Sequence, residues 1–153
     1  MIPKLRAWLK DEQEMHDVLA FDTRGHSFLG IEGPHVTVDD WCDVFEVGEQ
    51  AELMQSTGLK DKSAKYEINN KDILLVDTFP ESSFKAKVVY ETGSFGVVAL
   101  KGDIVDYFPK HWNDTFMPLA ELYWIFDCED GVLDCVEILG NEFENPELLE
   151  EQR

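Results

Sequence analysis

The sequence predicts a mainly β protein, a single domain over residues 1–153 built from successive hairpins. Short apolar runs alternate with turn residues about every ten positions, a spacing typical of strands joined by tight turns. Hydrophobic residues make up 44% of the chain and aromatic residues 12%, enough for a packed core without a disulfide or a metal. Internal repeats are absent, so no solenoid is expected. We expect a small or partly open barrel with short helices near 39–47 and 146–152.

The start of the chain predicts a hairpin. KLRAWLK at 4–10 and MHDVLAF at 15–21 are two apolar-rich runs separated by the polar DEQE. The segment WCDVFEVG, within 39–48, fits either a strand or a short helix. Asp39 and Asp40 precede it as N-cap residues, which favours a helical turn.

The middle of the chain predicts a second hairpin over 85–100. KAKVVY and SFGVVAL are the apolar runs, and Thr92 with Gly93 forms a two-residue loop between them. This register places Tyr90 opposite Phe95 as an aromatic cross-strand pair.

A third hairpin is expected over 122–139. Asp130 and Gly131 are a strong signal for a type I′ turn, and both faces of the flanking runs are apolar. The hairpin is therefore expected to be central and covered on both sides. In this register Cys128 and Cys135 lie diagonally at roughly 7–8 Å, too far apart for a disulfide.

The tail ENPELLEEQR predicts a short helix over 146–152. Asn145 is the expected N-cap and Pro146 the first helical residue. Leu148 and Leu149 would pack the helix against the rest of the chain.

Large apolar residues on these runs predict the core, because each lies between turn signals. The expected core residues are Trp8, Tyr90, Phe95, Trp124, Phe126 and Leu133. Truncation of Trp124 or Phe126 to Ala would then cost about 3–5 kcal/mol of stability.

Charge is the strongest signal in the composition. The net charge is −19, and residues 1–59 carry 4 Lys/Arg against 12 Asp/Glu, whereas residues 111–153 carry 1 against 12. An acidic surface repels phosphate backbones and anionic lipid, which argues against direct nucleic-acid or membrane binding. The same charge keeps a small protein soluble, or forms an acidic face that imitates nucleic acid or docks on a basic partner.

No apolar run is long enough to cross a bilayer, and the first residues lack the pattern of a signal peptide. We therefore expect a cytoplasmic protein.

The motifs of common enzymes are absent. No nucleophile elbow, phosphate loop or dinucleotide fingerprint occurs, and the three cysteines, Cys42 included, have no metal-binding spacing and are expected as buried free thiols. His26 and His35 adjoin predicted turns and could approach each other, and HWND at 111–114 is the most enzyme-like cluster. We expect no catalytic residue, no cofactor and no metal site; stoichiometric zinc or manganese in the purified protein would contradict this.

Several segments resemble one family in the same order along the chain. They are MIPKLRAWLKDEQEMHDVLAFD at the start, LMQSTGLKDKSAKYEINNKDIL in the middle, VVYETGSFGVV next and VEILGNEFENPELLEE at the end. Together they resemble the YopX family of phage and prophage proteins and cover most of the chain, with 33–52 least constrained. The family's usual Gly before the strand Asp is Lys71 here, so the tight turn is expected to fall to Asn69 and Asn70 instead.

The central segment is expected to enter a strand as it does in SH3-like barrels, with Asp72 as the turn residue and 73–76 as the strand. The polar loop of this segment then has only a structural role. Alternatively, this neutral, lysine-bearing loop forms a contact surface for a partner. The candidate interaction residues are Lys60, Lys62, Lys65, His111 and Trp112.

The resemblance implies an accessory protein of a phage or prophage and brings no catalytic or cofactor residues with it. We expect a protein that is not an enzyme and acts by protein–protein interaction or self-assembly, including a homo-oligomer. The alternatives are an acidic mimic or decoy that binds a basic DNA-binding protein, and a small enzyme. Binding driven by charge should weaken with salt, whereas an apolar oligomer interface should barely respond.

Overall fold

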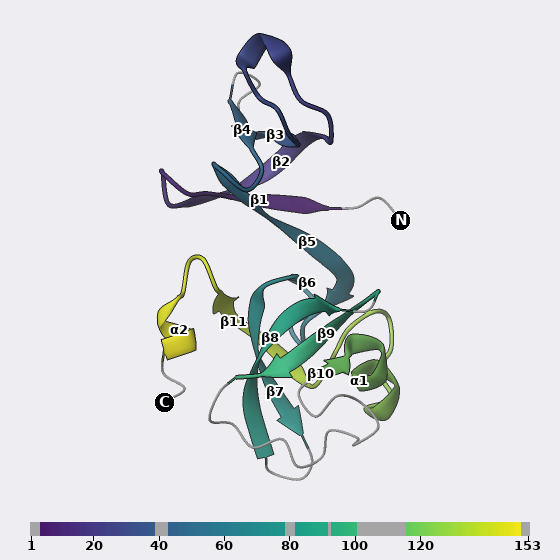
Figure 1. Ribbon diagram of the computed structural model, residues 1–153. Helices are drawn as coiled ribbons and strands as arrows, with labels where there is room; N and C mark the ends of the chain where they lie inside the picture. Colours follow the sequence, from purple (N-terminus) through teal and green to yellow (C-terminus); the bar gives the residue numbers. More distant parts are fainter. Residues whose placement is uncertain (1–3, 39–42, 79–81, 92, 101–115, 151–153) are drawn as a thin grey trace. The chain divides into compact units, whose positions relative to one another are not determined.

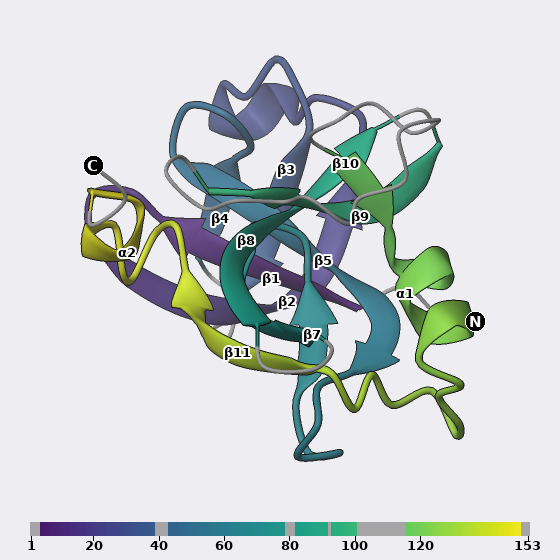
Figure 2. The ribbon, with the colours of Figure 1, turned by 90° about the horizontal axis from the view of Figure 1, so that it is seen from below.

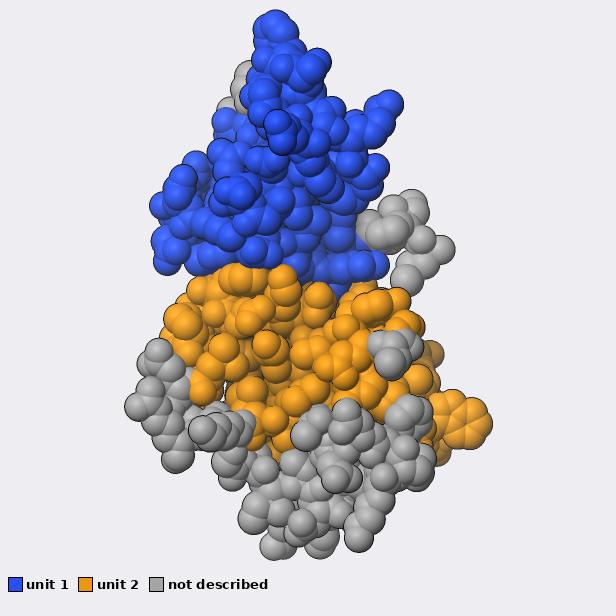
Figure 3. All heavy atoms as spheres, viewed as in Figure 1, with its two compact units in different colours: residues 1–55 blue, residues 56–153 orange. Residues whose placement is uncertain are grey.

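The computed structural model describes residues 4–38, 43–78, 82–91, 93–100 and 116–150, and it confirms a mainly β fold (Figure 1). The chain divides into two compact units, residues 1–55 and 56–153, which Figure 3 shows in blue and orange. Each unit is described separately below. The assignment of residues 1–153 to one domain stays a prediction.

The first unit contains an antiparallel sheet in the order β4-β3-β2-β1-β5. Its elements are β1 (Leu5–Leu9), β2 (Glu14–Asp22), the 3-10 helix η1 (Ser27–Leu29), β3 (His35–Val38), β4 (Val44–Glu46) and the first half of β5 (Ala51–Lys60).

The hairpin predicted at the start of the chain is confirmed as β1 and β2. Trp8 pairs with Met15 in its register and is buried, as predicted. Successive side chains of a strand point to opposite faces, so Ala7 and Leu9 share one face. They are at most 2% exposed and pack with Val36, Val38 and Ala51 as the core of this unit.

The short helix expected over 39–47 is wrong for its second half, because residues 44–46 form the strand β4. Phe45 pairs with Val36 across β3 and β4 and packs on the core of the first unit. Pairing with an existing sheet edge outweighs the weak local preference for a helix. The proposed N-caps Asp39 and Asp40 lie outside the described residues.

The second unit contains a five-stranded antiparallel sheet in the order β10-β9-β8-β7-β11 (Figures 1 and 2). Its elements are β6 (Glu67–Asn69), β7 (Asp72–Thr78), β8 (Ser82–Glu91), β9 (Ser94–Ala99), β10 (Phe116–Pro118), α1 (Leu119–Ile125), β11 (Val136–Asn141) and α2 (Glu147–Glu150).

Strand β5 takes part in both units: its first half pairs with β1, and Ser56 and Lys60 in its second half pair with β6. Neither sheet closes on itself within the described ranges, so the expected barrel is corrected to open sheets. The strand expected at 73–76 is confirmed as part of β7.

The hairpin predicted over 85–100 is confirmed as β8 and β9. Tyr90 pairs with Phe95, and their rings meet edge to face with centroids 5.0 Å apart. The prediction that both are core residues is wrong for Tyr90, which is 57% exposed, whereas Phe95 is half-buried. The pair lies near the tip of the hairpin, where the Tyr90 ring stays in contact with water.

The hairpin predicted over 122–139 is wrong, because its first strand is replaced by the helix α1. Leu119 and Leu122 lie three residues apart on the buried face of this helix. Trp124 points away and is 83% exposed, so its assignment to the core is also wrong, while Phe126 is half-buried at the helix end. Leu, Ala and Glu favour helices, but residues 122–126 are all apolar, so the sequence there shows no helical periodicity.

The turn at Asp130 and Gly131 exists nonetheless. Both residues have positive φ values, 57° and 72°, and the Val132 N–H donates to the Glu129 carbonyl at 3.1 Å. These are the features of a type I′ turn. Beyond the turn, Val132 forms a parallel bridge with Lys60 of β5 and does not return along 122–128.

The core of the second unit lies on one face of its sheet and under α1. Leu133 is fully buried, as predicted, and Leu122 joins it from the helix. The fully buried strand residues of this core include Leu74, Val76, Ala86, Val88, Val97 and Val136.

The predicted terminal helix is confirmed as α2, and Leu148 and Leu149 are half-buried. Asn145 plays another part than the predicted N-cap, since its Oδ1 accepts the Asn141 N–H at 3.2 Å. Neither α1 nor α2, the two α-helices in the described part of the chain, is long and apolar enough to cross a membrane.

Candidate functional site

Three of the predicted interaction residues, Lys60, Lys62 and Lys65, lie at the end of β5 and in the loop that follows. Lys62 forms an ion pair with Glu137 of β11 at 3.1 Å, which raises the pKa of the Lys62 ammonium. Lys65 is exposed and Lys60 partly so. A role for this surface in binding stays a prediction, and His111 and Trp112 lie outside the described residues.

The loop after β5 is built around Asp61, which is 4% exposed. One carboxylate oxygen accepts the Ser63 N–H at 3.1 Å and the Ser63 hydroxyl at 2.5 Å. The other accepts the Ile138 N–H of β11 at 3.2 Å. Asp61 therefore stabilises the loop and ties it to β11, which supports the interpretation of this loop as scaffold.

The turn before β7 comprises Asn70 and Lys71, and Lys71 itself adopts the glycine-like conformation, so the expectation that Asn69 and Asn70 make the turn in its place is corrected. Lys71 has a φ of 75°, the left-handed conformation that favours glycine. Asp72 is the turn residue that was predicted: it is 2% exposed and accepts the Asn69 N–H at 2.7 Å.

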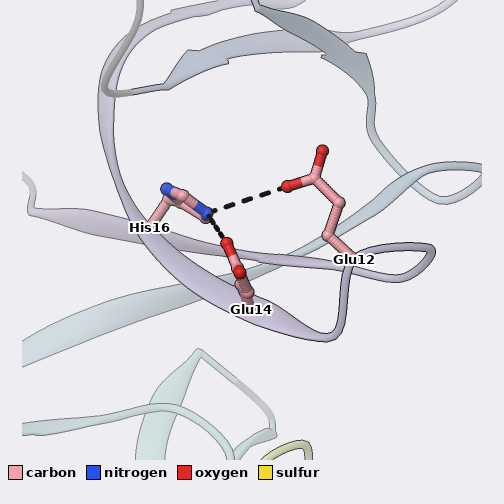
Figure 4. A group of neighbouring side chains, drawn as sticks. All are labelled: Glu12, Glu14 and His16. Carbon is pink, nitrogen blue, oxygen red and sulfur yellow. Dashed lines mark hydrogen bonds and ion pairs between the residues drawn. The ribbon is translucent and has the colours of Figure 1, made fainter.

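Glu12, Glu14 and His16 form a cluster on the β1–β2 hairpin (Figure 4). The His16 Nε2 lies 3.0 Å from a Glu14 oxygen and 4.0 Å from a Glu12 oxygen. All three ligand atoms fall within 4.8 Å of one another. This cluster was not predicted from the sequence, although residues 14 and 16 lie on the same face of a strand.

The His16 Nε2 lies near two carboxylates, and three ligands of this kind also suit a divalent cation. Both glutamates are exposed, and exposed acidic groups commonly gather without an ion. The cluster by itself therefore does not identify a metal site.

His26 and His35 lie together in the first unit, as the sequence suggested. Their rings meet edge to face with centroids 5.8 Å apart. His35 is 8% exposed, and its buried Nδ1 has no hydrogen-bond partner.

An open groove of about 380 Å³ lies in the second unit between α1 and the sheet. It is lined from the strands by Thr57, Leu59, Ser94 and Phe95, and from the helix by Leu119, Ala120, Tyr123 and Trp124. Among the described residues the lining carries no charged side chain, and three of its eight residues are aromatic. Sites of this kind bind apolar or aromatic groups.

Helix α1 shapes the groove through its period. Leu119 and Leu122 are buried beneath the helix, while Tyr123 reaches sideways and its hydroxyl accepts the Gly131 N–H at 3.0 Å. Trp124 is left on the rim with most of its ring in water. The tie from Tyr123 to Gly131 fixes the turn after α1 beside the groove.

Acidic residues belong to the elements that line this groove or adjoin it. Glu121 lies on α1, and Asp127 follows the helix. Glu129 and Asp130 are exposed in the turn that Tyr123 holds. Glu91 pairs with the groove residue Ser94 in the register of β8 and β9.

The buried cysteines offer little reactivity. Cys128 and Cys135 are free thiols, as predicted, although the hairpin on which that prediction was based does not form. Burial raises the pKa of Cys135 to about 12 and also raises the pKa of Cys128. The thiolate is the nucleophile, so neither is activated at neutral pH. Cys42 lies outside the described residues.

The groove was missed in the sequence because it depends on α1. The available signal was the spacing of Leu119, Leu122 and Tyr123, which fits one face of a helix. If the same residues formed a strand, Trp124 would lie in the core and there would be no groove.

Comparisons with known proteins agree with the resemblance noted in the sequence. The described fold is similar to the crystal structure of protein yopX from Bacillus subtilis, with a TM-score of 0.51 and 18% identity over 95% of this chain and 97% of that one. At this identity the likeness shows the fold alone. No curated protein matches the chain. The family model of the YopX protein matches residues 4–150, nearly the whole sequence, and this chain therefore belongs to the YopX protein family.

Proposed function

We propose that this chain is an accessory protein of a phage or prophage that is not an enzyme and acts by binding another protein in the groove beside α1. The observation that carries the proposal is Trp124, which is 83% exposed at the rim of a groove without charged lining. Tryptophan and tyrosine are enriched among the residues that dominate protein interfaces.

Further large apolar side chains of this unit are exposed. Ile125 follows Trp124 on α1 and is 53% exposed. Tyr90 is 57% exposed and meets Phe95, which lines the groove, edge to face. Large apolar side chains that gather in water are typical of interaction sites.

The test is a selection of peptides from a random display library on the wild-type protein, followed by affinity measurements on two variants. In Trp124→Ala the selected peptides should bind at least about tenfold more weakly, as expected for a central interface residue. Phe28→Ala is the matched control, because Phe28 is 91% exposed in the first unit. Equal binding to both variants, or no enriched peptide at all, would contradict the proposal.

Self-assembly is a second candidate, favoured by the edges of the five-stranded sheet. The edge strand β10 pairs with β9, and no second partner strand for it lies among the described residues. Unpaired strand edges are templates for pairing with another chain. Sedimentation of the pure protein at low and high salt tests this: an oligomer that persists at both supports it, and a strict monomer excludes it.

A further inference from the structure

The groove beside α1 combines an apolar lining with an acidic border, and this combination narrows the class of partner. The lining offers space for about one or two large side chains, because 380 Å³ lies near the lower end of ligand-site volumes, roughly 300–1,000 Å³. A whole folded surface does not enter such a groove. An extended or helical segment with one anchoring side chain does.

The acidic residues belong to three elements next to the groove: α1, the β8–β9 hairpin and the turn after α1. Glu121 is on the helix itself, and Glu91 lies across from Ser94 at the hairpin tip. Glu129 and Asp130 are held beside the groove by the bond between Tyr123 and Gly131. Their negative potential adds over the groove, whose apolar walls weaken screening by water.

Few described cations offset this charge. Lys62 already pairs with Glu137 at 3.1 Å. Lys60 lies beside the turn after α1, since its N–H donates to the Gly131 carbonyl at 2.8 Å, but it is one cation against Asp127, Glu129 and Asp130. A positively charged ligand therefore meets carboxylates at the border of the groove.

We infer that the groove receives a basic segment of another protein, and this inference rests on the function proposed above. In that segment an aromatic or leucine anchor is flanked by lysine or arginine. The anchor enters between Phe95 and Trp124, and the flanking cations meet the carboxylates of α1 and of the following turn. Nucleic acid is excluded as the occupant because its phosphates would face the same carboxylates.

The experiment measures fluorescence anisotropy of three labelled 12-residue peptides with the full chain. The first carries Trp and Leu anchors flanked by Lys, the second the same anchors flanked by Glu, and the third Lys flanks with the anchors replaced by Ser. The first should bind at least about tenfold more tightly than either of the others at about 50 mM salt, and several-fold more weakly at about 500 mM.

Two sets of substitutions locate the charge. Asp127→Asn, Glu129→Gln and Asp130→Asn together should weaken the Lys-flanked peptide about fivefold to tenfold at low salt. Asn is chosen at 127 and 130 because both residues have positive φ values, 51° and 57°, which Asn tolerates. The control variant, Asp11→Asn, Asp17→Asn and Glu32→Gln, removes as many charges from exposed positions of the first unit and should leave binding unchanged within about twofold.

The outcomes separate this inference from the proposed function. If the Lys-flanked and Glu-flanked peptides bind equally but both depend on Trp124, the groove binds protein and the basic partner is wrong. If neither peptide depends on Trp124, or if none binds, both proposals fail. If the peptide without anchors binds as tightly as the first, or the control variant is weakened as much as the groove variant, the attraction is general and the inference is overturned.

Discussion

At the scale of single residues, Lys71 adopts a backbone conformation that lysine rarely occupies. Its φ is 75°, its N–H donates to the Val88 carbonyl at 2.8 Å, and its ammonium lies 5.2 Å from the centre of the Phe143 ring. The surrounding contacts hold a conformation for which glycine has no steric penalty.

We expect Lys71→Gly to change the free energy of unfolding by less than about 1 kcal/mol, since relief of strain offsets the lost ring contact. Lys71→Val should cost about 1–3 kcal/mol, because a β-branched residue is strained at positive φ. Urea unfolding measures both. A Val variant as stable as the Gly variant would show that the positive φ is not required.

Cys135 gives a prediction about pH. Burial raises the pKa of its thiol to about 12, whereas an unfolded cysteine titrates near 8.5. The folded state thus holds the proton more tightly, and this stabilisation is complete below about pH 8.5 and declines as pH rises toward about 12. Denaturant unfolding at about pH 8 and about pH 10.5 should show a larger loss for the wild type than for Cys135→Ala. Equal losses in the two proteins would contradict the assignment.

At the scale of elements, α1 packs one face against the core of the second unit and leaves the other face in water. Leu122 is fully buried and Trp124 is 83% exposed, only two residues apart. The same helix therefore contains a residue of the core and a residue available to a partner.

Leu122→Ala should cost about 2–5 kcal/mol, because it removes buried methyl groups and leaves a cavity. Trp124→Ala should change stability by less than about 0.5 kcal/mol, as expected for an exposed position. Thermal unfolding of the two variants measures the difference. A Trp124→Ala protein destabilised as much as Leu122→Ala would restore the buried hairpin that the sequence suggested.

The elements also show which parts of the fold were readable in the sequence. The hairpins of β1 with β2 and of β8 with β9 are apolar-rich runs separated by short polar turns, so local pattern determines them. Residues 122–126 are apolar on consecutive positions, and such a run fits a buried strand and a helix equally well. The groove could not be predicted because it exists only if that segment is a helix.

At the scale of the whole molecule, charge dominates. The chain carries a net −19, and each of the two compact units has a large excess of Asp and Glu. Like charges repel within a folded chain, and dissolved salt screens that repulsion.

The melting temperature should therefore rise by a few degrees between about 50 mM and about 500 mM sodium chloride. The variant with Asp11→Asn, Asp17→Asn and Glu32→Gln, which has three fewer negative charges, should show a smaller rise. Scanning calorimetry measures both proteins. A melting temperature that falls with salt would mean that attractive ion pairs outweigh the repulsion.

The exposure of Trp124 gives the protein an optical reporter at its own groove. An indole in water emits at longer wavelength than a buried one, so a ligand that covers Trp124 should shift the emission toward the blue. The chain's other tryptophans, Trp8, Trp41 and Trp112, supply a background, which a Trp124→Phe variant measures. Acrylamide, a neutral quencher that the acidic border does not repel, should reach Trp124 in the free protein and lose access once the groove is filled. Occupancy can thus be followed without any label.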